Sequence, residues 1–338
     1  MNNNISSSLP SGTYFITGIT GFIGSLLTRF LLQSPQYQNH EITIIGLIRD
    51  QDKANRLYQS YDCSGLSFIP SDLVQLTPQL LRNQYQIQQI DYLFHCAANT
   101  RSSDMVTYPV ETANGILIGT NNVLEIAKEY NVRSMVYLSS MEVYGSVSQS
   151  SERFTEDRLG FIDPFSTRSC YPLGKRMAEN LCYCYYKQYQ VPVKIARLAQ
   201  TFGPGVLSNE NRIFYQFAKC ALTGNDIVLH TKGDSVGNYV DSMDAVDALL
   251  LLLLKGEDGE AYNIANEANT MTILDMARLV ASKIAHNRIQ VQFDIPKENQ
   301  FGYAAKTELR LSAQKIRNLG WNPNFGIEDM YLRMLSEM

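Results

Sequence analysis

The sequence lacks the features that mark several broad classes of protein. No block of basic residues accompanies its formal charge of -4, so binding to a nucleic acid has no support. Its longest apolar run, Ala248 to Leu254, is much shorter than the about 20 residues that cross a bilayer. We therefore expect a globular protein that binds neither nucleic acid nor membrane, with a chain long enough to bury a large core.

Residues that typically hold metals are also scarce. The chain has four histidines and six cysteines, and neither type shows the close spacing of a metal site or a redox motif. We expect reduced core thiols and no bound metal. Residues 1–10 are polar and contain neither the basic nor the apolar segment of a signal peptide, so we expect a loose tail and a cytoplasmic protein.

A glycine-rich turn lies near the start of the chain. The β-prone run Tyr14–Thr17 leads directly into glycines spaced three apart, and an amphipathic helical pattern follows. Such glycines let backbone N–H groups and a helix N-terminus approach a pyrophosphate, where a Cβ atom would block the way. Because the strand and the helix are both present, the motif predicts a dinucleotide site. Its expected contact residues are Gly18, Gly21, Phe22, Ile23 and Gly24.

The end of the next expected strand bears on the choice of cofactor. Ile42–Ile48 is a continuous apolar run, as in a strand buried on both faces of a parallel sheet, and Arg49 and Asp50 follow it. An acidic residue at this place binds the ribose of NAD, whereas a guanidinium suits the 2′-phosphate of NADP. We favour NADP(H) over NAD(H) because of Arg49. The alternative is a solvated Arg49 with Asp50 at the ribose.

Three more β-rich runs, at residues 68–73, 92–98 and 135–138, surround a helical pattern at 114–130. Strands that alternate with helices predict an α/β fold with a doubly wound parallel (Rossmann) sheet, which binds ligands at the carboxyl ends of its strands. Further expected cofactor contacts are Asp72, Leu73, Ala97, Ala98, Asn114 and Ser139. Asp72 fits the role of a turn cap equally well.

The predicted domain organisation follows from where this alternation stops. We expect a disordered tail over residues 1–10 and the dinucleotide-binding domain over 11–200. After residue 200 the pattern changes to loops around helical stretches at 212–223, 243–254 and 272–286, with a last amphipathic helix near 315–321. We assign residues 201–338 mainly to a smaller, mixed substrate-binding lobe, part of which returns to the first domain.

Tyr171 and Lys175 form the pattern that most suggests catalysis. Residues four apart share a helix face, so the ammonium can lie beneath the phenol and favour its ionised form. A free phenol titrates near pH ~10, so a phenolate usable near pH ~7 needs a shift of roughly 3 units, or ~4 kcal/mol. The same spacing also occurs at Tyr183/Lys187 and Tyr215/Lys219, so only the surroundings can select one pair.

These motifs, in this order, resemble the extended short-chain dehydrogenase/reductase family, the NAD(P)-dependent nucleotide-sugar epimerases and dehydratases. The resemblance covers nearly the whole chain. It includes the glycine turn, His95-x-Ala97-Ala98, Ser139-Ser140-x-x-Val143-Tyr144-Gly145, Tyr171-x-x-x-Lys175 and Leu319-Gly-Trp-x-Pro323. The segment Arg168-Ser-Cys-Tyr171 is most similar to UDP-glucuronate decarboxylases, and Ser140-x-Glu142-Val-Tyr resembles those enzymes and the GDP-mannose 4,6-dehydratases.

The resemblance implies roles for four catalytic residues. Tyr171 would remove the proton of the sugar C4 hydroxyl as a hydride leaves for the nicotinamide. Lys175 would hold the nicotinamide ribose and lower the phenol pKa, and Ser140 would share the proton. Glu142 would act in the next step, which we expect to be loss of water or decarboxylation, with epimerisation as an alternative. A Glu142 that is merely hydrogen-bonded at a strand end also fits the sequence.

Two departures from the family bear on the substrate. Met141 stands where many dehydratases have an Asp before the Glu, and Gly237 stands where most relatives have an arginine that grips the pyrophosphate. The expected substrate contacts are Thr100, Gln200, Arg212, Lys232 and Arg310. An NADPH-dependent carbonyl reductase for a non-nucleotide substrate and a dinucleotide-sensing protein without turnover are further alternatives. Relatives commonly dimerise through the helices near Asn114 and Tyr171, so we expect a homodimer.

Overall fold

The structure is a computed structural model, described for residues 8–146, 152–208, 210–296 and 308–338. The chain divides into two compact units. The first unit comprises the chain up to Gly145 together with residues 161–197 and 246–262. The second unit comprises residues 146–160, 198–245 and 263–338. Each unit is therefore built from several separate stretches of the sequence.

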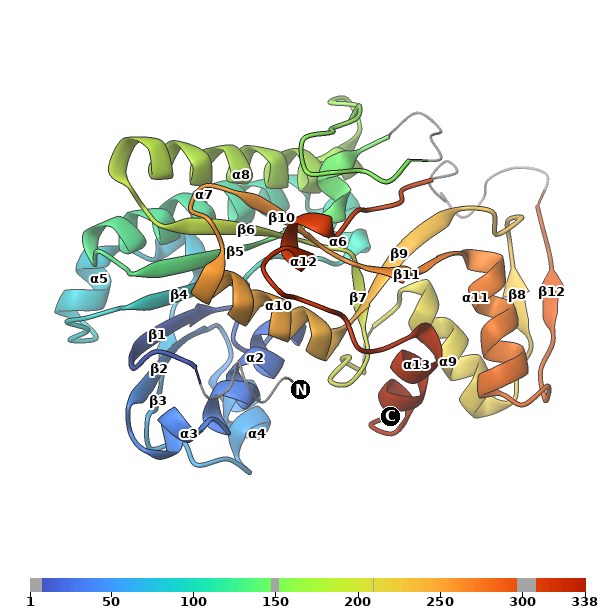
Figure 1. The fold of residues 1–338 in the computed structure, drawn as a ribbon, viewed down its shortest axis with the longest axis horizontal. Helices are drawn as coiled ribbons and strands as arrows, with labels where there is room; N and C mark the ends of the chain where they lie inside the picture. The colour runs from blue at the N-terminus through green and yellow to red at the C-terminus, as the bar shows by residue number, and fades with distance from the viewer. Residues whose placement is uncertain (1–7, 147–151, 209, 297–307) are drawn as a thin grey trace. The chain divides into compact units, whose positions relative to one another are not determined.

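A seven-stranded sheet forms the centre of the first unit (Figure 1). In spatial order its strands are β10 (Ala261–Ile264), β6 (Val193–Leu198), β5 (Ser134–Ser140), β4 (Tyr92–His95), β1 (Gly12–Thr17), β2 (Ile42–Ile48) and β3 (Leu66–Pro70). The pairings from β3 through to β5 are parallel. The chain starts in the middle of the sheet, proceeds to one edge and then crosses to the other side of β1, which confirms the predicted doubly wound α/β fold.

Helices cover both faces of this sheet. The long helices α7 (Pro109–Glu129) and α8 (Cys170–Tyr189) lie side by side (Figure 1). The other helices of the unit are α2 (Phe22–Leu32), α3 (Pro35–Gln38), α4 (Gln51–Tyr58), η1 (Leu73–Gln75), α5 (Pro78–Asn83), α6 (Ser102–Thr107), η2 (Met141–Tyr144) and η3 (Thr167–Ser169). Helix α10 (Ser242–Lys255) begins in the second unit and ends in the first. No helix in the described ranges has both the length and the apolar character to cross a membrane.

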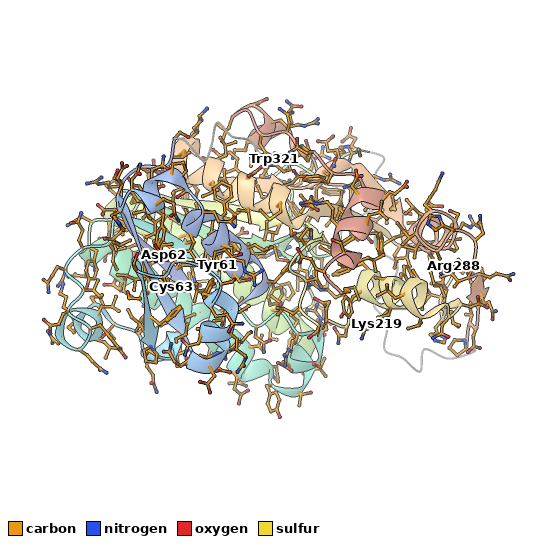
Figure 2. All side chains as sticks on the ribbon, turned by 90° about the horizontal axis from the view of Figure 1, so that it is seen from below. Tyr61, Asp62, Cys63, Lys219, Arg288 and Trp321 are labelled. Carbon is orange, nitrogen blue, oxygen red and sulfur yellow. The ribbon has the colours of Figure 1, made fainter. Side chains whose placement is uncertain are left out.

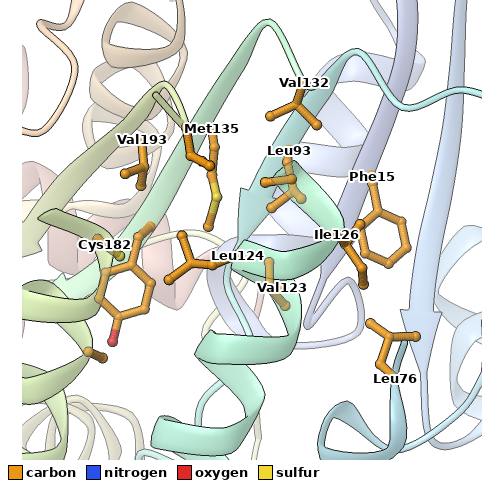
Figure 3. Close-up of a cluster of buried hydrophobic side chains, with 14 of the residues drawn as sticks. Phe15, Leu76, Leu93, Val123, Leu124, Ile126, Val132, Met135, Cys182 and Val193 are labelled. Atoms are coloured by element: carbon orange, nitrogen blue, oxygen red, sulfur yellow. The ribbon is translucent and has the colours of Figure 1, made fainter. Parts of the chain in front are cut away.

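The core of the first unit lies between the sheet and α7, as Figure 3 shows. Val123, Leu124 and Ile126 of α7 face Phe15 of β1 and Leu93 of β4, and all five side chains are fully buried. Apolar residues every three or four positions give α7 a continuous apolar side, which is why it packs on the sheet. This packing fixes the strand ends from which the candidate site residues project.

In its described residues the second unit contains two small sheets and, besides the start of α10, five helical segments. One sheet has the order β11 (Asn266–Thr272), β9 (Val236–Asp241), β7 (Gln200–Phe202), and the other pairs β12 (Val291–Phe293) with β8 (Ile227–Leu229). The helical segments are α9 (Ile213–Thr223), α11 (Ile273–Leu279), the π-helix η4 (Val280–Ile284), α12 (Gln314–Arg317) and α13 (Ile327–Leu335). Phe202 and Phe214 stack at the centre of its core, with ring centroids 4.6 Å apart.

Several predicted elements have different boundaries in the structure. The helix predicted at 114–130 begins at Pro109, because proline fits the first helical position, where no N–H is needed. The helical stretch predicted at 272–286 changes from α to π at Val280. The last predicted helix, at 315–321, is the single turn α12, and the chain reaches Gly320 in a left-handed conformation with φ of 101°.

Candidate active site

The glycine turn between β1 and α2 has the shape that a dinucleotide requires. Gly18 has φ of 68°, and a Cβ atom there would lie 2.7 Å from the backbone nitrogen of Ala97. Gly21 donates its backbone N–H to the carbonyl of Gly18 at 2.8 Å, and a Cβ atom on Gly24 would collide with that carbonyl. A side chain is therefore excluded at Gly18 and at Gly24, so the backbone of the turn can approach a phosphate group closely.

The start of α2 is suited to an anion. No side chain caps Gly21, and the first turn, which includes Phe22 and Ile23, contains no acidic residue. The first N–H groups of a helix carry partial positive charge and point out of its N-terminus. The residues present therefore fit the pyrophosphate of a nicotinamide dinucleotide, held by Gly18, Gly21 and the first turn of α2.

Two carboxylates that the sequence offers for cofactor binding, those of Asp50 and Asp72, are engaged in capping. Arg49 follows β2 directly and is exposed, whereas Asp50 caps α4 by accepting the N–H of Lys53 at 2.9 Å. Asp72 caps η1 in the same way, through the N–H of Val74 at 2.9 Å. The structure thus gives Asp72 the capping role that the sequence left open.

The remaining expected cofactor contacts follow β4 or lie on α7. Ala97 donates its N–H to the hydroxyl of Thr17 at 3.2 Å, which ties the end of β4 to β1. Ala98 and Thr100 are exposed just beyond it. Leu73 packs against α7 at Gly119, where no Cβ atom fills the space. Asn114 lies on α7 and lines a shallow hollow together with Pro164, Ser166 and Cys170.

The end of β5 and the start of α8 carry the four expected catalytic residues in one unit. Ser140 is the last residue of β5, and its hydroxyl accepts the N–H of Glu142 at 3.2 Å as η2 begins. Tyr171 and Lys175 lie one turn apart near the start of α8, and both are buried. The neighbouring Ser139 instead donates its hydroxyl to the carboxylate of Glu179 at 2.5 Å.

The three tyrosine–lysine pairs differ in burial more than in separation. The lysine nitrogen lies 6.0 Å from the ring centroid in Tyr171/Lys175, 5.2 Å in Tyr183/Lys187 and 4.8 Å in Tyr215/Lys219. Lys187 and Lys219 are exposed, the latter on α9 as Figure 2 shows. Lys175 alone of the three lysines is buried, at 3% exposure. Desolvation is therefore what distinguishes the pair beside Ser140.

Burial changes the protonation of the groups around Lys175. Loss of solvent lowers the pKa of Lys175 to about 8, although the nearby carboxylate of Glu179 acts in the opposite direction. The ammonium donates to the carbonyl of Leu138 at 2.6 Å. His95 lies between the hydroxyls of Thr17 and Thr120, and burial lowers its pKa to about 3, so it is neutral. The site thus holds a cation that is ready to lose its proton just above neutral pH.

Glu142 forms an ion pair with Arg168 that no local sequence pattern predicts. A single guanidinium nitrogen of Arg168 donates to both carboxylate oxygens of Glu142, at 3.0 and 2.8 Å. The two residues are 26 positions apart, on η2 and η3, and each side chain is about one-third exposed. Arg168 lies three residues before Tyr171, so the ion pair is close in sequence to the expected catalytic tyrosine as well as to Ser140.

A buried network behind these residues was also missed. Glu179 accepts hydrogen bonds from Arg197 through both carboxylate oxygens, at 2.8 to 3.2 Å, and Arg197 donates to the hydroxyl of Tyr144 at 3.0 Å. With Ser139 the network joins β5, η2, α8 and β6. The sequence contains one indication of this network. Glu179 follows Lys175 by four residues and Tyr171 by eight, so all three side chains share a face of the helix.

The expected substrate contacts of the second unit lie in different settings. The side-chain oxygen of Gln200 is buried and has no hydrogen-bond partner among the described residues. Arg212 pairs with Glu210 and stacks on the ring of Phe214. Lys232 is exposed and Arg310 is half-buried.

Gly237, where the family resemblance leads us to expect an arginine, lies beside Tyr239. A Cβ atom on Gly237 would lie 2.8 Å from the Tyr239 hydroxyl. Among the described residues, no group of His, Cys, Asp and Glu side chains is arranged to hold a metal ion.

Comparisons with known proteins agree with this geometry. The profile of the NAD dependent epimerase/dehydratase family matches residues 14–265. A UDP-glucuronic acid decarboxylase 1 from Danio rerio is 29% identical over 314 residues, which cover 93% of this chain and 69% of the relative.

Two solved structures share the fold. One is a UDP-glucuronic acid 4-epimerase from Bacillus cereus in complex with UDP-glucuronic acid and NAD, with a TM-score of 0.77, 22% identity and coverage of 96% of this chain and 98% of that one. The other is a dTDP-glucose 4,6-dehydratase from Bacillus anthracis in complex with NAD, with a TM-score of 0.77, 23% identity and coverage of 96% of both chains. The glycine turn, the Ser140–Tyr171–Lys175 set and the profile match agree: this chain is an enzyme of the NAD-dependent epimerase/dehydratase family.

Proposed function

We propose that this enzyme decarboxylates a nucleotide-uronate, a nucleotide-sugar with a carboxylate at C6, after it oxidises the C4 hydroxyl. The observation that carries the proposal is the ion pair between Glu142 and Arg168 beside Ser140. This pair bears on the step after oxidation, which is where decarboxylases and dehydratases differ. The 29% identity to a decarboxylase gives additional support.

Tyr171, Lys175 and Ser140 serve the oxidation of C4. The phenolate of Tyr171 takes the proton of the C4 hydroxyl as a hydride leaves C4, and the Lys175 ammonium favours that phenolate. The hydroxyl of Ser140 holds the same oxygen. The nicotinamide cofactor, when bound, supplies a hydride acceptor that also returns the hydride at the end of the cycle.

The oxidised uronate is a β-keto acid, and its decarboxylation needs no acid at a leaving group. The C5–C6 bond breaks, CO₂ departs and the bonding electron pair moves to the C4 oxygen. Tyr171, now protonated, and Ser140 donate hydrogen bonds to that oxygen as negative charge develops on it. C5 then takes up a proton and the hydride returns to C4, so the sugar loses CO₂ with no net redox change.

Glu142 is poorly suited to the alternative, loss of water. A departing hydroxyl needs a proton donor, but both oxygens of Glu142 are engaged as hydrogen-bond acceptors by Arg168. Met141, in place of the usual Asp, has no proton to give. In our proposal Arg168 also offsets the repulsion between the Glu142 carboxylate and the carboxylate of a uronate.

We also propose that Arg49 shifts the preference of this enzyme towards NADP(H), although two solved relatives hold NAD. Arg49 is exposed directly after β2, and the carboxylate of Asp50 is occupied by the helix cap. Titration of the enzyme with both dinucleotides, for the natural chain and for Arg49→Ala, tests this. We expect NADP⁺ affinity to fall about tenfold with NAD⁺ affinity unchanged, since one ion pair to a phosphate is lost. An unchanged ratio of the two affinities would exclude the role.

A homodimer through α7 and α8 is a further part of the proposal. Val110 and Ile118 of α7 and Tyr183 of α8 are 65%, 44% and 45% exposed, so the outer side of this helix pair presents apolar surface. Light scattering on the natural chain should give the mass of two copies. Ile118→Glu should give a single copy, and a natural chain that is monomeric at micromolar concentration would rule out the dimer.

The reaction is tested by incubating the enzyme and NAD(P)⁺ with UDP-, dTDP-, GDP- and CDP-sugars, each as the hexose and, where accessible, the uronate. We expect a uronate to lose CO₂, and Tyr171→Phe to abolish this while Tyr183→Phe leaves it intact. Loss of water would assign a dehydratase, and a product of unchanged mass an epimerase. Consumption of NADPH in a parallel incubation with NADPH and a simple carbonyl compound, without turnover of any nucleotide-sugar, would assign a carbonyl reductase.

A further inference from the structure

The ammonium of Lys175 lies against an aromatic ring that is not part of the tyrosine–lysine motif. Its nitrogen is 4.6 Å from the ring centroid of Tyr137, nearer than to the ring of Tyr171 at 6.0 Å. Tyr137 belongs to β5, and because side chains alternate along a strand it shares a face with Ser139, which bonds to Glu179 of α8. The sheet therefore presents this ring directly to the helix that carries Lys175.

Few negative charges are available to balance this buried ammonium. Glu179 is the carboxylate that acts on it, but both Glu179 oxygens also accept hydrogen bonds from the positively charged Arg197. Cys96 and Cys182 lie nearby, and burial raises the pKa of both thiols, so they remain neutral. His95, also near, is neutral, and Tyr171 is the proton acceptor of our proposed reaction. The Leu138 carbonyl and the Tyr137 ring are left as direct contacts of the charge.

The contact between Tyr137 and Lys175 involves the ring of the tyrosine and not its hydroxyl. Tyr137 is 1% exposed, and its hydroxyl lies near the Thr120 side chain without a hydrogen bond of normal geometry. The ring face, by contrast, attracts a cation strongly when both are shielded from water.

We propose that Tyr137 is a positioning residue whose ring face keeps Lys175 charged and holds its ammonium beneath Tyr171. This proposal deepens the proposed function, because the charge on Lys175 is what favours the phenolate of Tyr171. It concerns the lysine itself, however, and can be measured without any substrate. A desolvated cation–π contact is strong enough to alter the protonation of the lysine at the pH where the enzyme would work.

The test is a series of ring substitutions that keep the shape of the side chain. Tyr137 is replaced by phenylalanine and by its mono-, di- and trifluorinated analogues, since fluorine weakens the attraction of the ring for a cation. The titration midpoint of Lys175 is followed by NMR in protein labelled with ¹³C-lysine, and Lys175→Met identifies its signal. Thermal unfolding of each protein shows that the fold is retained.

We expect Tyr137→Phe to leave the midpoint unchanged and the fluorinated series to lower it stepwise, by about one pH unit at the trifluoro analogue. The alkaline limit of sugar turnover should move in parallel. A midpoint that is the same across the series would overturn the role of Tyr137. A stepwise shift in a protein that turns over no nucleotide-sugar would instead support Tyr137 and reject the proposed reaction.

Discussion

Lys175→Met should make the cofactor-free enzyme more stable at neutral pH. Burial lowers the pKa of Lys175 from 10.5 to about 8. At 1.36 kcal/mol per unit, a shift of about 2.5 units means that keeping this side chain protonated at pH 7 costs the folded state on the order of 3 kcal/mol. The variant loses this cost, but it leaves the Leu138 carbonyl without its donor. We therefore expect a net gain in unfolding free energy of about 1–3 kcal/mol.

The sign of the pH dependence makes this prediction specific. The folded state releases the Lys175 proton near pH 8, whereas the unfolded chain keeps it to about pH 10.5, so the natural chain gains stability relative to the variant as pH rises between these values. Urea unfolding of both proteins at pH 7, 8.5 and 10 measures the difference. A gap that is largest at pH 7 and shrinks by pH 10 is expected. A variant less stable than the natural chain at pH 7, or a gap independent of pH, would refute the reasoning.

Three further predictions concern residues outside the catalytic set. Glu179→Gln should lower the unfolding free energy by about 3–5 kcal/mol in urea unfolding, because Arg197 would then be buried without its counter-ion; a loss below about 1 kcal/mol would contradict this. Burial raises the pKa of Asp241 to about 6, so the stability that protonated Asp241 contributes to the folded state is lost as the pH rises from about 4 to 6. Asp241→Asn should therefore flatten the pH dependence of the unfolding free energy in this range, and a slope unchanged from the natural chain would contradict the prediction. Gly24→Ala should abolish NAD(P)⁺ binding in calorimetry, because its Cβ collides with the Gly18 carbonyl; unchanged affinity would show that the turn does not hold the cofactor.

The fold and the order of the motifs could be predicted because local patterns determine them. Ile42–Ile48 is apolar apart from the exposed Thr43, as expected for a strand covered on both faces, and β2 has these bounds. The glycine turn lies between a strand and a helix, as its spacing predicted. Tyr171 could be preferred over the other two tyrosines because it is the first of the three after the strand that ends at Ser140, and Tyr183 lies about 120° round the same helix.

The contacts that surround the site could not be predicted, because they join residues distant in sequence. Arg168 contacts Glu142 only when η3 lies beside η2 in the fold. Tyr137 contacts Lys175 only when α8 packs on β5 in the observed position. Helix boundaries were also imprecise: the first residues of α7, from Pro109, were not recognised as helical, since their apolar pattern is weak.

The central claim is that Tyr171 and its neighbours oxidise C4 of a nucleotide-uronate, which then loses its C6 carboxylate. The most direct measurement uses a nucleotide-uronate labelled with ¹³C at C6, incubated with the enzyme and NAD(P)⁺. We predict that ¹³CO₂ and the nucleotide-pentose form in equal amounts, and that Tyr171→Phe forms neither while it still binds the dinucleotide. Turnover of the labelled uronate that retains all of its ¹³C, or an equally active Tyr171→Phe enzyme, would contradict the account.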